Sequence, residues 1–556
     1  MPVTTIMVLV LIAAAAGLEI LAERLAIPRP VALLAGGLGI ALVPGLPRAE
    51  LDPEVIFVIF IPPLLYWAAV NSSLRDFRVY AVAISMAGVV LVLATIAAVA
   101  ATVHALVPPM SWAVAVTLGA IVAPPDVVVT ISMLHGMALP RPVTTILLGE
   151  SLVNDAAALV VYRMAVTAGL VGTFAWNHAL WDFTRIAFGG LGIGLAVGYL
   201  VAAARRQAGD TPPLQNTISL LTPFAAYLPA DALHVSGVLS VVAAGLYLGR
   251  ETPRIITAET RMQARDTWDV MSHILENLTF LLVGLDLPYA REAWHHYRLL
   301  DLLWYVIAIC GAIALVRLAA TLLTAYAPRW LGRSADAAAP NFRQVLFVGW
   351  AGLRGGDSLV IALTLPMVFA EPAVSPGRNL VIVLTFGVVL VSIFVQGPSL
   401  RPVARWLKLQ DDGLAVAEER DARHQVALAG LSALDGLDPA SFDWVDGLVV
   451  SEVMQQLREM YATAPVSSSI ETKTLEPPPN RAWVRAYFDM RSRMVRAERV
   501  EVIQLRDSEV INEQVMNRLL RELDLEEVLL ADKLRSITSL SSAAVAHAPA
   551  SLDDAR

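Results

Sequence analysis

The chain has 556 residues, of which 56% are hydrophobic and only 16% are charged, and its mean hydropathy is +0.62. This composition excludes an ordinary soluble protein, because soluble domains carry about 25% charged residues. The net charge of −8 argues against a nucleic-acid partner, and the single cysteine, Cys310, excludes an intrachain disulfide and a cysteine-based metal cluster.

Apolar stretches recur from Val3 to about Val395, and each is long enough to cross a bilayer as a helix. We count about thirteen spans, which predicts an all-α polytopic membrane protein, although the weak break at Pro229 leaves twelve or fourteen open. Lys and Arg gather on one set of alternate loops and just after the last span. The positive-inside rule therefore places the N-terminus outside and the C-terminal tail in the cytoplasm.

The fifth predicted span is interrupted by Pro124 and Pro125, and Asp126 follows them. Because proline has no backbone N–H, this pair leaves carbonyl oxygens of the helix without partners. A charge in mid-membrane costs about 2.5–3.5 kcal/mol on insertion scales, so the charges that are present mark an interior pathway. A carboxylate beside such carbonyls is a suitable environment for a hard cation.

The sixth predicted span contains the sequence GESLVNDAAALVVY. Ser151 and Asp155 are four residues apart, so they share a helix face that Asn154 adjoins. Their oxygens can replace part of the hydration shell of Na⁺ or Li⁺. A carboxylate removed from water also binds a proton more readily, so Asp155 can hold either ion. Competition between the cation and the proton at Asp155 produces exchange if the protein reorients with either ion bound but does not reorient when the site is empty and charged.

The twelfth predicted span is interrupted by Gly352, Gly355 and Gly356, with Arg354 and Asp357 beside them. This break lies seven spans after the first, as expected for two six-helix inverted repeats joined by an extra helix. Either break alone is compatible with a harmless kink, since Pro and Gly are common in membrane helices. Together, two broken helices flanked by charges favour a transporter site near the middle of the membrane.

The other charges in the spans are interpreted as structural. Glu150 lies about 140° around its helix from the predicted ion ligand, so it need not face the ion. Its expected partner is Arg354, because a buried ion pair would hold two interrupted helices together. Glu276 and Arg317 are predicted to pair between helices, and Arg163 to lie near one helix end.

A different domain begins behind the last span, so we divide the chain into a transport domain, residues 1–405, and a cytoplasmic helical tail, residues 406–556. Within the tail, residues 501–530 carry apolar residues at helical spacing and charges on the other face. The tail contains no glycine-rich phosphate loop, metal-ligand cluster or nucleotide-binding fingerprint. A stabilising or dimerising appendage and a regulator that responds to pH or a ligand both stay open.

Several motifs together resemble those of the NhaP/NHE-type Na⁺/H⁺ antiporters over nearly all of residues 1–405, in particular a bacterial subgroup with a helical tail. They are FIPPLLY at residues 60–66, GESLVND at 149–155, ENLTFLLVGLDL from Glu276, GWAGLRGG around Arg354 and FVQGPSLRP at 394–402. Each motif is weak alone, but their joint occurrence in this order is specific. The resemblance implies a secondary active antiporter of a bacterial inner membrane, not an enzyme and without a cofactor, that exchanges Na⁺ or Li⁺ for H⁺ in pH homeostasis and sodium tolerance.

The resemblance also implies a mechanism and a site. In that family an Asn-Asp pair marks the electroneutral branch, so Asn154 and Asp155 imply one-for-one exchange. The implied fold is a homodimer in which a core around the two broken, crossing helices moves as an elevator. Carried over residue by residue, the Na⁺ site comprises Asp155, Asp126 and Ser151, with Asn154 positioning it and the carbonyl of Pro125 as a further ligand.

Two departures from the family pattern leave the choice of ion open. Relatives commonly carry an acidic residue directly after the PPLL[FY] motif, where this chain has Trp67, and a Thr before the Asp of the fifth span, where it has Pro125. A K⁺/H⁺ antiporter with the same mechanism is therefore the alternative. Glu150 and Arg354 match the structural ion pair of the family.

Other classes of function fit less well. A transporter of organic anions needs cationic contacts where this site presents Asp126 and Asp155. A membrane enzyme is disfavoured because candidate histidines such as His104 and His234 lie at span ends, and no HExxH or GxSxG motif occurs. A passive channel could use the same ligands, and only saturable exchange driven by either ion gradient would distinguish it.

Overall fold

The computed structural model describes residues 2–43, 53–72, 86–107, 110–134, 137, 139–171, 176–285, 297–330, 341–365, 377–409, 413–463 and 481–546. Within these ranges the chain is helical and contains no strand. It divides into two compact units, residues 1–209, 213–255 and 265–412, and residues 210–212, 256–264 and 413–556. The division that we predicted after residue 405 lies in the last turn of a helix, shortly before the main boundary between the units.

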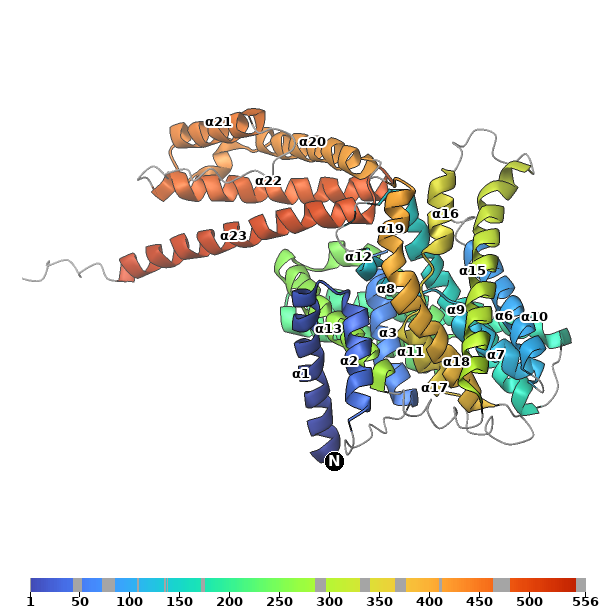
Figure 1. Cartoon of the computed structure of the whole chain (residues 1–556). Helices are drawn as coiled ribbons and strands as arrows, with labels where there is room; N and C mark the ends of the chain where they lie inside the picture. Colours follow the sequence, from blue (N-terminus) through green and yellow to red (C-terminus); the bar gives the residue numbers. More distant parts are fainter. Residues whose placement is uncertain are drawn as a thin grey trace, which may run out of the picture. The chain divides into compact units, whose positions relative to one another are not determined.

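The first unit is a bundle of helices (Figure 1). Up to residue 255 these are α1 (Pro2–Leu25), α2 (Arg29–Ala41), α3 (Pro53–Val70), α6 (Val92–Leu106), α7 (Trp112–Val122), α8 (Val127–Met133), α9 (Arg141–Val171), α10 (Trp176–Gln207), α11 (Pro212–Ala232) and α12 (Gly237–Ile255). They are followed by α13 (Ala258–Leu285), α15 (Leu299–Trp330), α16 (Phe342–Trp350), α17 (Gly356–Leu363), α18 (Arg378–Val391) and α19 (Gly397–Trp406). Short π-helical segments, Met86–Leu91 and Ser392–Gln396, lead into α6 and α19.

Four helices in the described part are long and apolar enough to cross a membrane: Gly88–Leu106, Thr184–Gln207, Leu299–Tyr326 and Arg378–Trp406. Shorter apolar helices accompany them, and one of these, Trp112–Val122, ends at the predicted proline break. Large apolar side chains such as Phe188 and Leu300 are exposed on the outer faces of α10 and α15, which suits contact with lipid. The number of spans and the inverted repeats stay predictions.

Small residues allow close packing where α10 meets α12. Gly190 and Gly194 of α10 lie directly against the backbone carbonyls of Ser236 and Ser240, so a Cβ at either glycine would overlap those oxygens. Spacings of four between small residues are a common way for membrane helices to approach each other. The α10–α12 contact therefore depends on the absence of side chains at these two positions.

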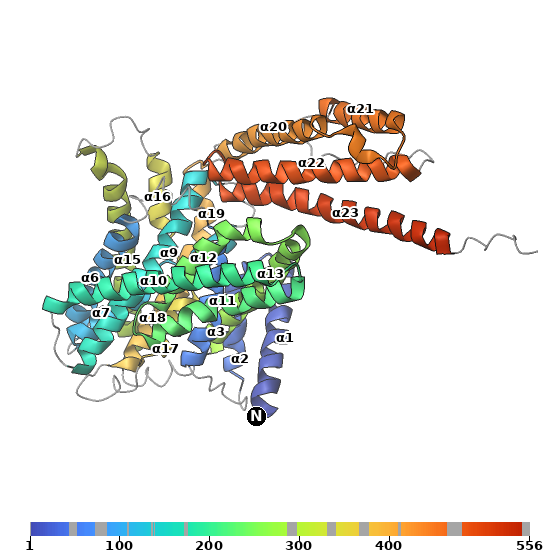
Figure 2. The same ribbon diagram turned by 180° about the vertical axis from the view of Figure 1, so that it is seen from behind.

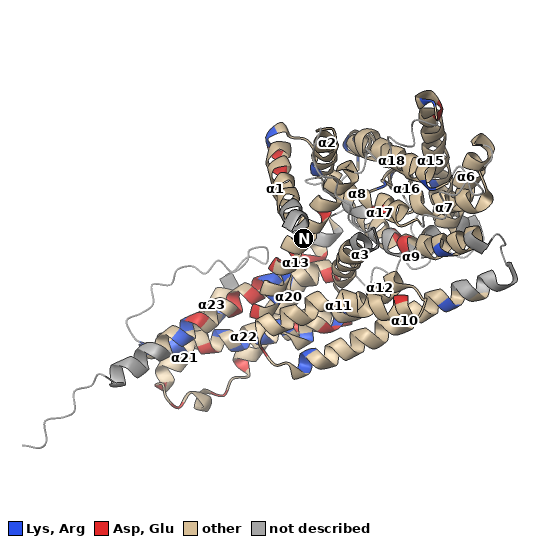
Figure 3. Cartoon of the chain, turned by 90° about the horizontal axis from the view of Figure 1, so that it is seen from below, with Lys and Arg blue, Asp and Glu red and all other residues tan. Residues whose placement is uncertain are grey.

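The second unit is built from the tail helices α20 (Leu414–Asp435), α21 (Gly447–Thr463), α22 (Arg481–Asp507) and α23 (Glu513–Ala546). Helix α22 packs against the other three, and Figures 1 and 2 show it between α20 and α23. Apolar side chains such as Met490 and Val502 fill the core on both sides of α22. Charged residues are frequent along these helices, whereas the helices of the first unit carry few (Figure 3).

Residues 256–264, which comprise the link after α12 and the first turns of α13, belong to the second unit. Arg261 binds Asp524 of α23 through two hydrogen bonds, with Nε 2.7 Å from Oδ2 and Nη2 2.6 Å from Oδ1. Asp524 is buried, and its Oδ1 also lies 3.0 Å from Nη2 of Arg499. From the sequence, Arg261 was only one of the positive loop residues; the structure shows that it is a partner of the tail.

We expect Arg261→Ala to destabilise the second unit by about 3 kcal/mol, because it leaves a buried carboxylate with one of its two arginines. Hydrogen exchange of the full-length protein should show faster exchange in α23 and unchanged exchange in α7. Arg265→Ala, one turn further along α13, is the control, since Arg265 forms no ion pair with another described residue. Equal exchange of α23 in the parent and Arg261→Ala would contradict the assigned role.

Candidate functional site

The first helix interruption separates α7, which ends at Val122, from α8, which begins at Val127. Asp126 stands just before α8, and its Oδ1 accepts a hydrogen bond from the backbone N–H of Val129 at 3.1 Å. This contact caps α8, which is the role that Asp commonly fills at a helix start. The predicted break is therefore present, and the capping contact fixes the side chain of Asp126.

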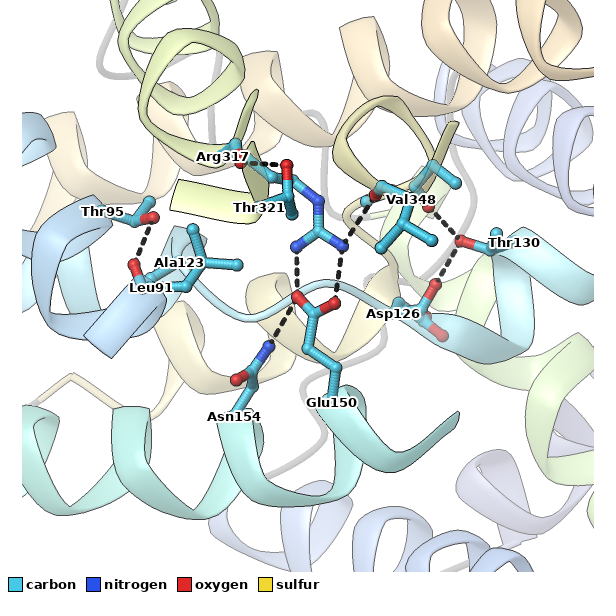
Figure 4. Close-up of polar contacts among 12 residues, drawn as sticks. Leu91, Thr95, Ala123, Asp126, Thr130, Glu150, Asn154, Arg317, Thr321 and Val348 are labelled. Carbon is cyan, nitrogen blue, oxygen red and sulfur yellow. Dashed lines mark hydrogen bonds and ion pairs between the residues drawn. The ribbon is translucent and has the colours of Figure 1, made fainter. Parts of the chain in front are cut away.

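The second interruption lies between α16, which ends at Trp350, and α17, which begins at Gly356. It is bonded directly to the first: the backbone N–H of Asp126 donates to the carbonyl of Leu353 at 2.6 Å. The hydroxyl of Thr130 lies 3.0 Å from the carbonyl of Ala351 and 2.9 Å from that of Asp126 (Figure 4). The two breaks thus form one hydrogen-bonded scaffold.

Gly355 is required by this scaffold. Oδ2 of Asp126 lies so close to it that a Cβ at residue 355 would overlap the carboxylate. The φ angle of Gly355 is −106°, so the requirement is one of space and not of backbone conformation. The glycine therefore allows the two interruptions to meet at Asp126.

Arg354 caps the end of a broken helix. Its Nε and Nη2 donate to the carbonyls of Val122 and Ala123 at 3.0 Å each, and Nη1 donates to the carbonyl of Gly352. These carbonyls include the last of α7, which has no further helical turn to supply N–H groups. A cation at this position also interacts favourably with the negative end of the helix dipole. The backbone N–H of Arg354 is held in turn by Ser392 Oγ at 2.6 Å.

Glu150 pairs with Arg317 of α15, so the predicted pair with Arg354 is wrong (Figure 4). Nη1 and Nη2 of Arg317 lie 2.5 and 3.0 Å from the two carboxylate oxygens, and the two side chains are 1% and 0% exposed. Arg354 cannot serve because carbonyl oxygens occupy its guanidinium. The expectation that Arg317 pairs between helices is confirmed, with Glu150 as its partner.

Asn154 belongs to this buried pair. Its Nδ2 donates to Oε1 of Glu150 at 3.1 Å, and its Oδ1 has no hydrogen-bond partner among the described residues. Asn154 does not line the cavity described below. It links the Glu150–Arg317 pair to the next residue of α9, Asp155, which agrees with a positioning role.

A cavity of about 570 Å³, its open mouth included, lies beside the two interruptions. Three carboxylates from different parts of the chain line it: Asp126, Asp155 of α9 and Asp357 in the first turn of α17. The predicted site residues Asp126, Asp155 and Pro125 thus share one cavity. The side chain of Ser151, predicted as a ligand, lies outside the described residues.

Apolar side chains form most of the remaining wall, among them Leu65, Leu159 and Ile361, and Tyr162 and Ser358 also line it. No Lys or Arg is among the described residues that line the cavity. Neither Asp155 nor Asp357 receives a hydrogen bond from another described residue. Three carboxylates that share one space repel each other strongly when all are ionised. The cavity therefore favours the uptake of a proton or a cation.

The three carboxylates share the cavity without converging on one point: among the described residues, no three His, Cys, Asp or Glu side chains form a metal centre. An ion bound here would complete its shell with backbone oxygens and water. Such a shell suits a weakly held, transported ion better than a resident metal.

Sequence reasoning left Asp357 out of the predicted site. In the sequence, Asp357 is a charged residue beside the second break, and this position could have indicated that it belongs to the site. Trp67, where the family resemblance led us to expect an acidic residue, stacks on Trp268 with ring centroids 5.6 Å apart and does not line the cavity. The third carboxylate of the cavity comes from α17.

The other charged residues that the sequence placed within the spans, Arg163 and Glu276, lie away from the cavity. Arg163 of α9 binds Asp231 at 2.6 Å, near the end of α11. Glu276 forms no ion pair with another described residue, contrary to the predicted interhelical pairing. Neither residue lines the cavity.

Comparison with known proteins was made by sequence and by structure. A model of the family described as "Sodium/hydrogen exchanger, transmembrane" matches residues 8–406. The chain is 32% identical over 550 residues to an uncharacterised Na⁺/H⁺ exchanger of Mycobacterium tuberculosis strain H37Rv, a match that covers 95% of this chain and 96% of that protein. It is 28% identical over 554 residues to the Na⁺/H⁺ exchanger YjcE of Escherichia coli K12, covering 95% and 99%.

Two further matches cover about two thirds to three quarters of this chain. A Bacillus subtilis protein named sodium, potassium, lithium and rubidium/H⁺ antiporter is 28% identical over 378 residues, which is 66% of this chain and 56% of that protein. The solved structure of the sodium proton antiporter MjNhaP1 from Methanocaldococcus jannaschii matches with a TM-score of 0.56 at 18% identity. That match covers 73% of this chain and 98% of the antiporter, and at this identity it supports the fold alone.

Proposed function

Because the chain belongs to the sodium/hydrogen exchanger family, as an NhaP-type membrane antiporter of monovalent cations and protons, we propose that it exchanges Na⁺ or Li⁺ for H⁺ one for one. The exchange is electroneutral and depends on competition between the two ions for Asp155. The observation that carries the proposal is the cavity in which Asp126 and Asp155 meet beside two bonded helix interruptions.

Asp155 is the group at which the two ions compete. It lines the cavity and receives no hydrogen bond from a described residue, so binding an ion stabilises it. Asp126, whose carboxylate is fixed by the cap on α8, contributes nearby, together with the carbonyl of Pro125 and the hydroxyl of Ser151. Proton and cation cannot occupy the same carboxylate oxygen, so each displaces the other.

Alternating access follows from moving this site as a unit. The bonds between the two interruptions tie Asp126 to the start of α17, so these elements move together. We assign them to the mobile core of an elevator, in a homodimer whose fixed helices form the interface. The protein lies in a bacterial inner membrane with its N-terminus outside and its tail in the cytoplasm.

A K⁺/H⁺ antiporter with the same mechanism is the second candidate. The Bacillus subtilis relative is named for potassium and rubidium as well as for sodium and lithium. Pro125 also removes a hydroxyl that relatives of this family tend to place beside the site. Both observations bear on ion choice and leave the competition at Asp155 unchanged.

Transport by the purified full-length protein in proteoliposomes tests the proposal. A pH-sensitive dye inside the vesicles should report saturable proton movement after external pulses of Na⁺ or Li⁺, with a weaker response to K⁺. Reversing the cation gradient should reverse the proton movement, and an imposed membrane potential should leave the rate unchanged. Vesicles without protein are the control.

Each other outcome has a distinct meaning. Proton movement that depends on no cation would remove the proposed function. Flux that does not saturate, and is not coupled between the two ions, would indicate a channel. A rate that changes with the membrane potential would contradict electroneutral exchange, and a stronger response to K⁺ would favour the second candidate.

A further inference from the structure

The cavity holds one carboxylate that the proposed mechanism does not use. Asp357 lines it together with Asp126 and Asp155, and it belongs to a different helix from either. It receives no hydrogen bond and forms no ion pair with another described residue. A static structural role would require such a partner, because burying a charged group without one is costly.

The scaffold of the two interruptions fixes the place of Asp357. Residues 353–355 carry the contacts to Asp126, and Asp357 follows them at the second position of α17. The carboxylate is thus held in the cavity by the same elements that hold Asp126.

On the basis of the proposed function, we propose that Asp357 is an affinity- and selectivity-determining residue of the cation site, where it contributes a third carboxylate to the bound monovalent cation. Its negative charge attracts the ion across the cavity, and its oxygens contact the ion through water. Because it stands on α17 and not on α9, it acts on the cation without replacing Asp155 as the group of exchange.

Asp357→Asn tests this assignment, since it removes the charge and keeps the size. The apparent KM for Na⁺ and Li⁺ in proteoliposomes should rise about tenfold or more, the effect of removing a unit charge near an ion in a partly buried site. The maximal rate should change less than the KM. Asp301→Asn, the same change at an exposed position in the first turn of α15, is the matched control and should leave the KM unchanged.

Cation-dependent thermal stabilisation of the detergent-purified protein gives a readout that needs no transport. The Na⁺ concentration at half-maximal stabilisation should rise with Asp357→Asn by the same factor as the KM. Unchanged values of both quantities would overturn the proposal. If Asp357→Asn does not fold, Asp357→Glu decides: moving the carboxylate by one methylene should change the KM ratio among Li⁺, Na⁺ and K⁺, and an unchanged ratio would overturn the proposal.

Failure of this inference is distinguishable from failure of the proposed function. A parent protein that moves no protons in response to cations refutes the exchange itself. A parent that exchanges, with Asp155→Asn inactive and Asp357→Asn at parental KM, refutes only the role of Asp357.

Discussion

Asp155→Asn should abolish exchange, reducing cation-driven proton movement in proteoliposomes by about a hundredfold or more, while the protein stays folded. The amide keeps the size of the side chain but can neither release a proton at neutral pH nor carry the charge that balances a bound cation. Folding should survive because the Asp155 side chain forms no ion pair or hydrogen bond with another described residue.

The measurement requires two controls. Asp301→Asn removes the same charge from an exposed position of the membrane unit and should exchange at the parental rate. Size-exclusion profiles of both variants should match the parent, so that loss of rate is not loss of protein. Parental exchange by a folded Asp155→Asn would show that the two ions compete at another group, and Asp357 would then be the first to test.

The sequence predicted the kinds of residue at the site better than their pairings. Both helix interruptions could be predicted from two prolines and three glycines, because these residues disturb a helix at their own positions. The partner of Glu150 was not local: two buried arginines, Arg317 and Arg354, were available on separate helices. Which arginine meets the carboxylate depends on how α15 and α16 pack against α9, and spacing along one chain does not contain that information.

The same reasoning explains the residues that were missed. Asp357 enters the cavity because the break before α17 is bonded to Asp126, a contact between residues more than two hundred positions apart. Arg261 was counted only as a cytoplasmic charge, since its buried partner, Asp524, lies in the tail. The helical class and the tail followed from composition and periodicity, which are properties of each segment alone.

The Glu150–Arg317 pair should carry the largest share of stability of any single contact in the membrane unit. Glu150→Leu leaves an arginine that is 1% exposed without its carboxylate, and the loss of one partner of a buried pair costs about 3–5 kcal/mol. Thermal unfolding of the detergent-purified full-length protein, followed by tryptophan fluorescence, should show a correspondingly lower midpoint.

Two double variants separate the observed pair from the one that the sequence suggested. Glu150→Leu with Arg317→Met removes both charges, and an apolar replacement of a buried pair is often close to neutral, so stability should recover. Glu150→Leu with Arg354→Met should be less stable than either single variant, because Arg354 holds the carbonyls at the end of α7. Recovery by the second double variant instead of the first would mean that Arg354 is the true partner.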